Sequence, residues 1–210
     1  MIELQIDQAN PEPERIRQAA EAVKAGQVIV FPTDTVYALG ASLFDFPAVA
    51  RIFELKGRQE GKGLIVIIAD QADLAAVCPA VPATAEALIS RFWPGPLTLV
   101  MPAAAPVPAA VAVQGTVGVR LPDNKLVRSL VRAVGHPLAT TSANLSGRVS
   151  AVDAEAARAA IDDLPDVFID GGRCSLGIES TVADTRTWPP TIFREGAISK
   201  AALWEALDLK

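Results

Sequence analysis

The sequence predicts one α/β domain over residues 1–210, built on a mixed β-sheet with flanking helices. Helical and strand-like segments are intermixed along the chain, without an internal repeat or a long linker. Half of the residues are hydrophobic, which is enough for a sizeable core. Residues 64–69 form a continuous apolar run, which is typical of a strand covered on both faces.

Helices are predicted where apolar residues recur at helical spacing. In residues 12–24, Ile16, Ala19 and Val23 share one face, and Gly26 follows as a stop signal. The other predicted helices cover residues 47–56, 70–77, 83–92, 124–134 and 153–162, with a short one after residue 199.

Strands are predicted where apolar residues run together or alternate with polar ones. In residues 116–121, Val117 and Val119 fall on one face, and Thr116 and Arg120 fall on the other. The other predicted strands cover residues 27–31, 64–69, 97–101, 137–141, 167–170, 180–184 and 191–194, and residues 103–115 are expected to form a mobile loop.

The composition argues against an extended nucleic-acid surface and against a membrane segment. The net charge of −5 repels polyanions, although a local basic cleft and a weak tRNA contact stay open. The N-terminus shows no apolar signal segment, and prolines interrupt the nearly uncharged residues 92–122. Cys78 and Cys174 are expected to be free thiols, which favours a cytoplasmic location.

Several common catalytic and cofactor sites find no support in the sequence. His136 is the only histidine and lies between a predicted helix and strand, where a plain turn residue is the simpler interpretation. With two distant cysteines, no metal site made of protein side chains is predicted. Residues 57–63 lack the spacing of a Walker loop, and no G-x-G-x-x-G motif occurs.

Two polar clusters are candidates for a site that binds a small anionic ligand. Residues 32–40 gather hydroxyls, a carboxylate and a phenol after a predicted strand, where α/β sheets bind ligands, although an ordinary turn has the same composition. Lys56, Arg58 and Lys62 place three cations beside glycines, which suits a triphosphate. A solvated loop is the alternative for these three.

Arg120 requires a partner because it lies on a strand in an almost chargeless stretch. That partner is either an internal Asp or Glu, or a ligand carboxylate held bidentately. Thr140, Ser142 and Asn144 follow a short strand and can bind phosphate or ribose oxygens, or cap a turn. Ser180, at the start of a strand, is equally ambiguous.

Taken together in chain order, these clusters resemble a known family. The motifs read PTDTVYALG from residue 32, K-x-R from 56, WPGPLT from 93, V-x-VRLP from 117, TSANLSG from 141, GIESTV from 177 and R-x-GAI from 194. They are similar, over about residues 10–200, to the YrdC/TsaC family of threonylcarbamoyl-AMP synthases. Because the chain stops at residue 210, it resembles the short, single-domain type.

The resemblance implies a twisted sheet with a concave, basic cleft and a specific reaction. Such enzymes join L-threonine, bicarbonate or CO2, and ATP to give L-threonylcarbamoyl-AMP and pyrophosphate, with Mg2+ expected on the phosphates. Partner proteins, the threonylcarbamoyl transferases, then modify an adenosine of tRNA. We therefore expect a cytoplasmic nucleotidyltransferase that acts in tRNA modification.

The resemblance also assigns residues to the two main substrates. L-threonine is expected at Thr35, Arg120, Thr140 and Ser180. ATP is expected at Arg58, Lys62, Thr116, Ser142, Asn144, Ser150 and Arg194. Lys56 and Arg58 are expected to stabilise charge, and no side chain stands out as a general base.

Three positions depart from the family pattern, and two other functions compete with the synthase. Ala38 replaces a glycine, Glu195 replaces a proline beside Arg194, and Ile67 stands where some relatives have a threonine-contacting histidine.

Hydrogenase-maturation carbamoyltransferases share a related domain, but the chain has neither their length nor their cysteines. An RNA-binding module of the same fold, without synthase activity, is the second alternative.

Overall fold

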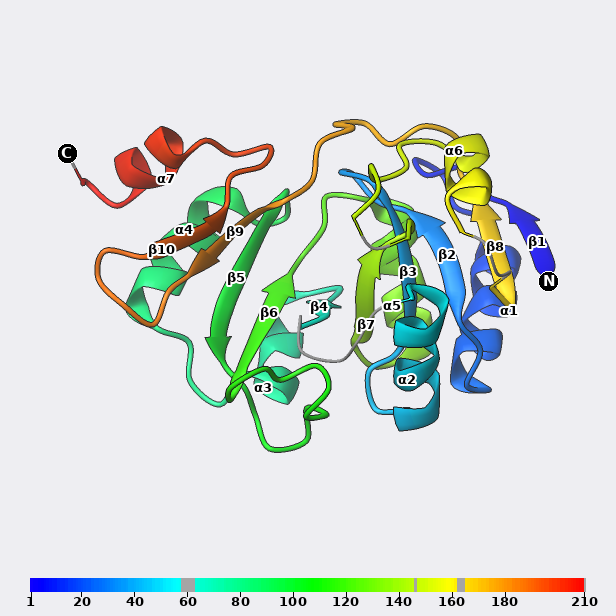
Figure 1. The fold of residues 1–210 in the computed structure, drawn as a ribbon, viewed down its shortest axis with the longest axis horizontal. Helices are drawn as coiled ribbons and strands as arrows, with labels where there is room; N and C mark the ends of the chain where they lie inside the picture. Colours follow the sequence, from blue (N-terminus) through cyan, green and yellow to red (C-terminus); the bar gives the residue numbers. More distant parts are fainter. Residues whose placement is uncertain (58–62, 146, 162–164, 210) are drawn as a thin grey trace.

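One mixed sheet runs through the molecule and carries the helices on its two faces (Figure 1). The computed structural model describes residues 1–57, 63–145, 147–161 and 165–209. Within these residues, the spatial order of the ten strands is β1 (Ile2–Gln5), β8 (Val167–Asp170), β2 (Ile29–Pro32), β3 (Tyr37–Ser42), β7 (Leu138–Ser142), β4 (Ile65–Ile67), β6 (Thr116–Arg120), β5 (Leu97–Pro102), β9 (Thr181–Asp184) and β10 (Thr191–Arg194). The two termini lie at opposite ends of this sheet (Figure 1). Parallel pairs such as β4–β6 adjoin antiparallel pairs such as β5–β6, so the predicted mixed sheet is confirmed.

The helices form two layers of unequal extent. One face of the sheet packs against α1 (Pro13–Lys24) and α5 (Lys125–Val134). The other face packs against α2 (Phe46–Leu55), α3 (Leu74–Val77), α4 (Ala83–Phe92), α6 (Ala154–Ala159) and α7 (Lys200–Ala206), and a 3-10 turn, η1 (Gln71–Asp73), precedes α3. None of the described helices combines the length and the apolar character that crossing a bilayer requires.

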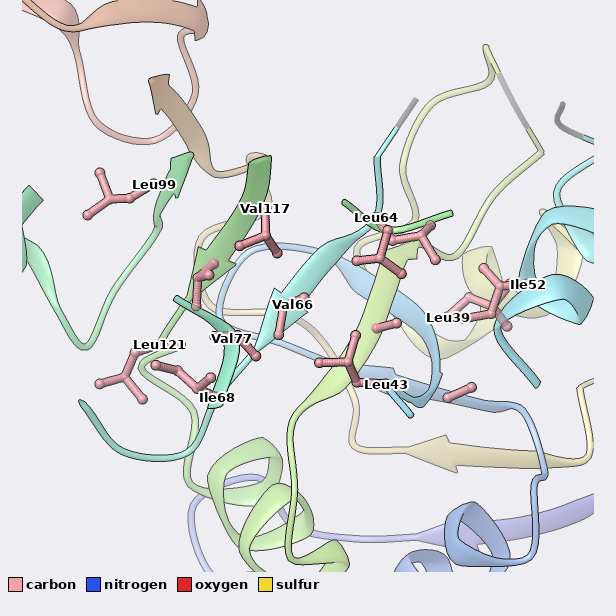
Figure 2. Close-up of a cluster of buried hydrophobic side chains, with 14 of the residues drawn as sticks. Leu39, Leu43, Ile52, Leu64, Val66, Ile68, Val77, Leu99, Val117 and Leu121 are labelled. Carbon is pink, nitrogen blue, oxygen red and sulfur yellow. The ribbon is translucent and has the colours of Figure 1, made fainter. Parts of the chain in front are cut away.

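Each face of the sheet has its own hydrophobic core. Under α1 and α5, the side chains of Ile16 and Leu130 pack in the same cluster as Phe31 of β2. On the opposite face, Val66 of β4 and Val117 of β6 belong to a larger cluster, which Figure 2 shows in close-up. Full burial of such a side chain contributes about 1.5–3 kcal/mol, so both cores hold the sheet in place.

Most predicted elements are present, but two strands were not foreseen. β1 pairs with β8 at one edge, and β3 lies in the middle of the sheet between β2 and β7. The helix predicted over residues 70–77 is divided into η1 and α3, because the Asp73 carboxylate accepts bonds from the backbone of Ala69 and Asp70. Residues 103–115 form a loop as predicted, and it buries Val107 and Val111.

The strand β6 explains where a ligand can lie. Val117 and Val119 point into the larger core, so Gly118 and Arg120 point to the opposite face, as the alternation predicts. On that face the α1–α5 layer packs on β1, β2, β4, β7 and β8, together with Ala38 of β3, and no described helix packs there on β6, β5 or β9. The sheet face around β6 is therefore open to a ligand.

Candidate active site

A cavity of about 370 Å³ lies on this open part of the sheet face. Strands β3, β7, β4, β6, β9 and β10 all contribute lining residues, and so do the segments after β2 and β7. Eight of the twelve predicted site residues line it: Thr35, Lys56, Arg120, Thr140, Ser142, Asn144, Ser180 and Arg194. Segments that are far apart in the sequence are therefore brought together around one cavity.

Arg120 and Thr35 form the inner end of the cavity, and Asp34 lies behind them as the ion-pair partner of Arg120. Arg120 Nη2 donates to Asp34 Oδ1 at 2.5 Å, and Nη1 donates to Thr35 Oγ1 at 2.7 Å. The Arg120 and Asp34 side chains are only 6% and 3% exposed. Of the two partners that the sequence allowed for this guanidinium, the structure contains the internal one. A buried pair of this kind needs both members, because either charge alone would be costly.

A third contact fixes the plane of the Arg120 guanidinium. Its Nε donates to the carbonyl of Gly95 at 3.1 Å, in the turn after Trp93. That turn belongs to the WPGPLT motif, and its backbone positions Arg120. Burial lowers the pKa of Arg120, and the Asp34 carboxylate opposes this. Arginine keeps its charge in proteins. Two of the five N–H groups remain beyond these three bonds among the described residues.

The hydroxyls at the inner end are held by short local bonds. Thr35 Oγ1 lies 2.9 Å from Thr33 Oγ1, and Thr140 Oγ1 donates to the carbonyl of Ile65 at 2.8 Å. Ser180 Oγ lies 2.9 Å from Thr98 Oγ1 on the neighbouring strand. A hydroxyl that donates internally keeps its lone pairs for a ligand N–H. These three positions can therefore receive the polar groups of an amino acid.

Lys56 ties the end of α2 to the segment that follows β7. It is buried, and its Nζ donates to the carbonyl of Ser142 at 2.7 Å and to Asn144 Oδ1 at 3.0 Å. Ser142 Oγ also donates to Asn144 Oδ1, and Asn144 Nδ2 donates to the carbonyl of Arg148 at 2.5 Å. This network fixes a cationic side chain in the wall of the cavity.

Arg148, Glu179 and Arg194 form the mouth of the cavity, where side chains meet solvent. Arg194 donates through Nη1 to Glu179 Oε2, and through Nη2 to Ser180 Oγ at 3.1 Å. The other oxygen of Glu179 accepts from Ser150 Oγ. Two residues predicted to hold ATP therefore share one carboxylate. The carboxylate that pairs with Arg194 is thus Glu179 and not its chain neighbour Glu195. Glu195 is exposed and does not line the cavity.

The remaining predicted residues lie away from the cavity or outside the described part of the chain. Thr116 shares the β6 face with Arg120 but does not line the cavity, and its hydroxyl donates to the carbonyl of Val113 at 2.8 Å. Ser150 reaches the cavity only through Glu179. Arg58 and Lys62 lie outside the described residues, so their expected roles remain predictions.

Comparison with known proteins identifies the chain at the level of a family. The model of the Sua5/YciO/YrdC proteins, described as "Telomere recombination", matches residues 21–196. The chain belongs to this family. The resemblance that the ordered motifs indicated is confirmed, and the eight cavity residues named above lie within the matched range.

Curated relatives in the Sua5/YciO/YrdC family carry the name threonylcarbamoyl-AMP synthase. The protein of that name from Pyrococcus abyssi is 41% identical over 185 residues, which are 88% of this chain and 54% of the relative. A putative threonylcarbamoyl-AMP synthase from Mycobacterium tuberculosis is 37% identical over 97% of this chain and 94% of the relative. The chain thus spans about half the length of the first relative and nearly all of the second.

A solved structure of a family member has the same fold. The crystal structure of P. abyssi Sua5 complexed with L-threonine superposes with a TM-score of 0.94 at 38% identity. The match covers 99% of this chain and 61% of that chain. The α/β fold expected from the sequence is therefore confirmed.

Two of the three departures from the family pattern line the cavity. The Ala38 and Ile67 side chains both belong to the core under α1 and α5 and both border the cavity. Ile67 lies opposite Arg120 in the register between β4 and β6. The inner end therefore combines charged and hydroxyl groups with apolar neighbours, which suits a small amino acid.

The described cavity offers little to a metal ion directly. Glu179 is its one lining carboxylate among the described residues, and both oxygens of Glu179 are held by Arg194 and Ser150. No cluster of three His, Cys, Asp or Glu side chains suited to a metal occurs in the described ranges.

Three residues important to the site were not assigned from the sequence. Asp34 pairs with Arg120, Gly95 orients it, and Arg148 lines the mouth. Asp34 lies between two threonines of a recognised motif, and the need of Arg120 for an anion was a usable signal for it. Gly95 acts through its carbonyl, so no side-chain pattern could have indicated it.

Proposed function

We propose that this chain is an L-threonylcarbamoyladenylate synthase, which joins L-threonine, bicarbonate or CO2, and ATP, and releases pyrophosphate. The observation that carries the proposal is Arg120, a buried guanidinium in the wall of the cavity, with N–H groups beyond its internal bonds. A carboxylate is the anion that such a group binds in two-point geometry. The names of the relatives, and the L-threonine bound to P. abyssi Sua5, support threonine as its source.

The proposed placement puts threonine at the inner end and ATP toward the mouth. The threonine carboxylate would lie on Arg120, with the hydroxyls of Thr35, Thr140 and Ser180 around its amine and side chain. ATP is proposed to contact Arg58, Lys62, Thr116, Ser142, Asn144, Ser150 and Arg194. Lys56 is fixed in the cavity wall and, with Arg58, would stabilise charge on the phosphates.

The proposed reaction has two steps. The threonine amine attacks the carbon of CO2, forms the N–C bond of a carbamate and loses a proton; from bicarbonate the same bond forms with loss of water. A carbamate oxygen then attacks the α-phosphorus of ATP. The bond to the bridging oxygen breaks, and pyrophosphate leaves with its electron pair. The chain would contribute mainly positioning and charge stabilisation, as in other phosphorus-centred transfers.

The test measures pyrophosphate release from ATP with threonine and bicarbonate each present or omitted. A promptly quenched sample is analysed by mass spectrometry. Release that requires both co-substrates, together with the mass of threonylcarbamoyl-AMP, would support the proposal. Release that ignores threonine would contradict it. Salt-dependent tRNA binding without turnover would favour the alternative of an RNA-binding module.

The wider setting of the activity is part of the same proposal. The product would be consumed by transferase proteins that modify tRNA, with at most a weak tRNA contact of this chain itself. A cytoplasmic location is supported by Cys78 and Cys174, which are both buried free thiols. Mg2+ is proposed to accompany ATP on its phosphates.

A further inference from the structure

The cationic side chains around the cavity differ in their partners within the protein. Arg120 is paired with Asp34, and Arg194 is paired with Glu179. Lys56 donates to the carbonyl of Ser142 and to Asn144. Arg148 lines the same cavity, and the structure gives its side chain no ion pair or hydrogen bond within the described ranges. Its charge is therefore not compensated by any described part of the protein.

The backbone of Arg148 is fixed although its side chain is exposed. Its carbonyl accepts from Asn144 Nδ2 at 2.5 Å, and its N–H donates to the carbonyl of Leu145 at 3.1 Å. Gly147, with φ of 86°, supplies the left-handed conformation that this turn requires. Because Asn144 is in turn held by Lys56, the buried network sets the position from which the Arg148 side chain extends.

We propose that Arg148 binds the β- and γ-phosphates of ATP, the part that leaves as pyrophosphate. This inference rests on the proposed function and extends it to a residue that the sequence motifs did not assign. Arg148 lies at the mouth, whereas the carboxylate-binding group Arg120 is buried at the inner end. A nucleotide whose α-phosphorus meets a carbamate near Arg120 extends either its terminal phosphates or its adenosine toward the mouth, and the uncompensated charge of Arg148 selects the phosphates.

The chemistry favours phosphate over other ligands at this position. A guanidinium without an internal partner binds a phosphate through two parallel N–H bonds. At a partly hydrated mouth, such a contact gains from the high charge of a triphosphate, which adenosine lacks. The contact also neutralises charge that accumulates on the leaving group, so it would act in catalysis as well as in binding.

The experiment compares the affinities of wild type and Arg148→Ala for ATP, pyrophosphate and AMP by isothermal titration calorimetry. We expect ATP and pyrophosphate to bind about 10- to 100-fold more weakly to the variant, since one charge-assisted contact is lost, with AMP unchanged. Arg148→Lys should recover part of the affinity because it keeps the charge but not the two-point geometry. Arg17→Ala, an equal charge change on α1 away from the cavity, should have no effect.

The outcomes separate this inference from the proposed function. Equal affinities of wild type and Arg148→Ala for ATP would overturn the inference, as would an equal loss for AMP and ATP. A wild-type chain that binds ATP but forms no threonylcarbamoyl-AMP would sink the proposed function, and the role of Arg148 would still be decided by the binding data. The difference between wild type and Arg148→Ala should shrink as salt rises, because the contact is exposed.

Discussion

The inner end of the cavity and its mouth hold arginines of opposite character. At the inner end, Arg120 is buried and bonded to a carboxylate, a hydroxyl and a carbonyl. At the mouth, Arg148 is exposed and has no described partner, while Arg194 shares Glu179 with Ser150. A buried charge needs a partner within the protein even when no ligand is bound, whereas water stabilises an exposed charge until a ligand binds.

This difference indicates how the two ends can serve one reaction. The inner end is rigid and presents a group in a fixed orientation, which suits a small substrate that must be placed accurately. The mouth is more hydrated, and its charges suit a flexible, highly charged chain of phosphates. The comparison can be tested by removing one group at each end.

The largest effect is expected at the inner end, from Arg120→Ala. Removing the guanidinium leaves the Asp34 carboxylate buried without its cation, which should lower the free energy of unfolding by about 3–5 kcal/mol. Threonine-dependent turnover should be lost as well. Urea denaturation followed by circular dichroism measures the first effect. The double variant Arg120→Met, Asp34→Asn should be more stable than the single one, and equal stabilities would contradict this account.

A smaller effect is expected from Lys56→Met, between the two ends. The variant keeps most of the side-chain volume but removes the Lys56 bonds to the carbonyl of Ser142 and to Asn144 Oδ1, which keeps only the bond from Ser142 Oγ. We expect a loss of about 1.5–3 kcal/mol in the free energy of unfolding, and a lower kcat. Lys24→Met, on the exposed side of α1, is the matched control. If both variants unfold at the same urea concentration, the network does not stabilise the wall.

A pH-dependent effect is expected at the buried thiol of Cys174, which interacts electrostatically with Asp34 and Arg120 of the inner end. Burial raises the pKa of Cys174 from its ordinary 9.0 to about 11, and the Asp34 carboxylate adds to this. The folded state therefore keeps the thiol protonated up to a higher pH than the unfolded state does. The resulting contribution to the free energy of unfolding is complete below about pH 9 and is lost as the pH rises to about 11. Between these limits the wild type should lose on the order of 2 kcal/mol more than Cys174→Ala. Denaturant titrations measure these losses, and an equal loss of unfolding free energy in wild type and Cys174→Ala would contradict the prediction.

The smallest effect is expected at the mouth, from Glu179→Gln. The side chains of Glu179 and Arg194 are 34% and 39% exposed, so the pair should contribute less than about 1 kcal/mol to folding. With its carboxylate neutralised, Arg194 should bind ATP more tightly, by up to about fivefold. Calorimetry with ATP measures this, with Glu21→Gln on α1 as the control. Weaker ATP binding would show that Glu179 assists the nucleotide instead of competing with it.

The fold could be predicted wherever the hydrophobic pattern of a segment shows which of its faces is buried. β6 alternates and α5 has a clear apolar face, so both were found within a residue or two. β3 was not foreseen because all six of its residues are buried and it is rich in Ala and Gly, so it shows neither alternation nor a β-branched run. β1 depends on its pairing with β8, which is distant in the sequence.

The site residues follow the same rule: those in local motifs could be predicted, and their distant partners could not. The sequence shows that Arg120 needs an anion, but not that Asp34, 86 residues earlier, supplies it. Likewise, Arg194 and Glu179 could be recognised as members of motifs, whereas their pairing depends on how β9 and β10 are registered. Residue identities follow from local pattern; partners follow from the order of the strands.

The alternation of β6 also limits how this protein can change. Val117 and Val119 fill the core on one side, while Arg120 serves the cavity on the other, within one short strand. A substitution alters one of these sides at a time. An insertion or deletion of a single residue here would turn a valine toward the cavity and the guanidinium into the core. We expect relatives with this site to vary in β6 composition but to keep its length unchanged.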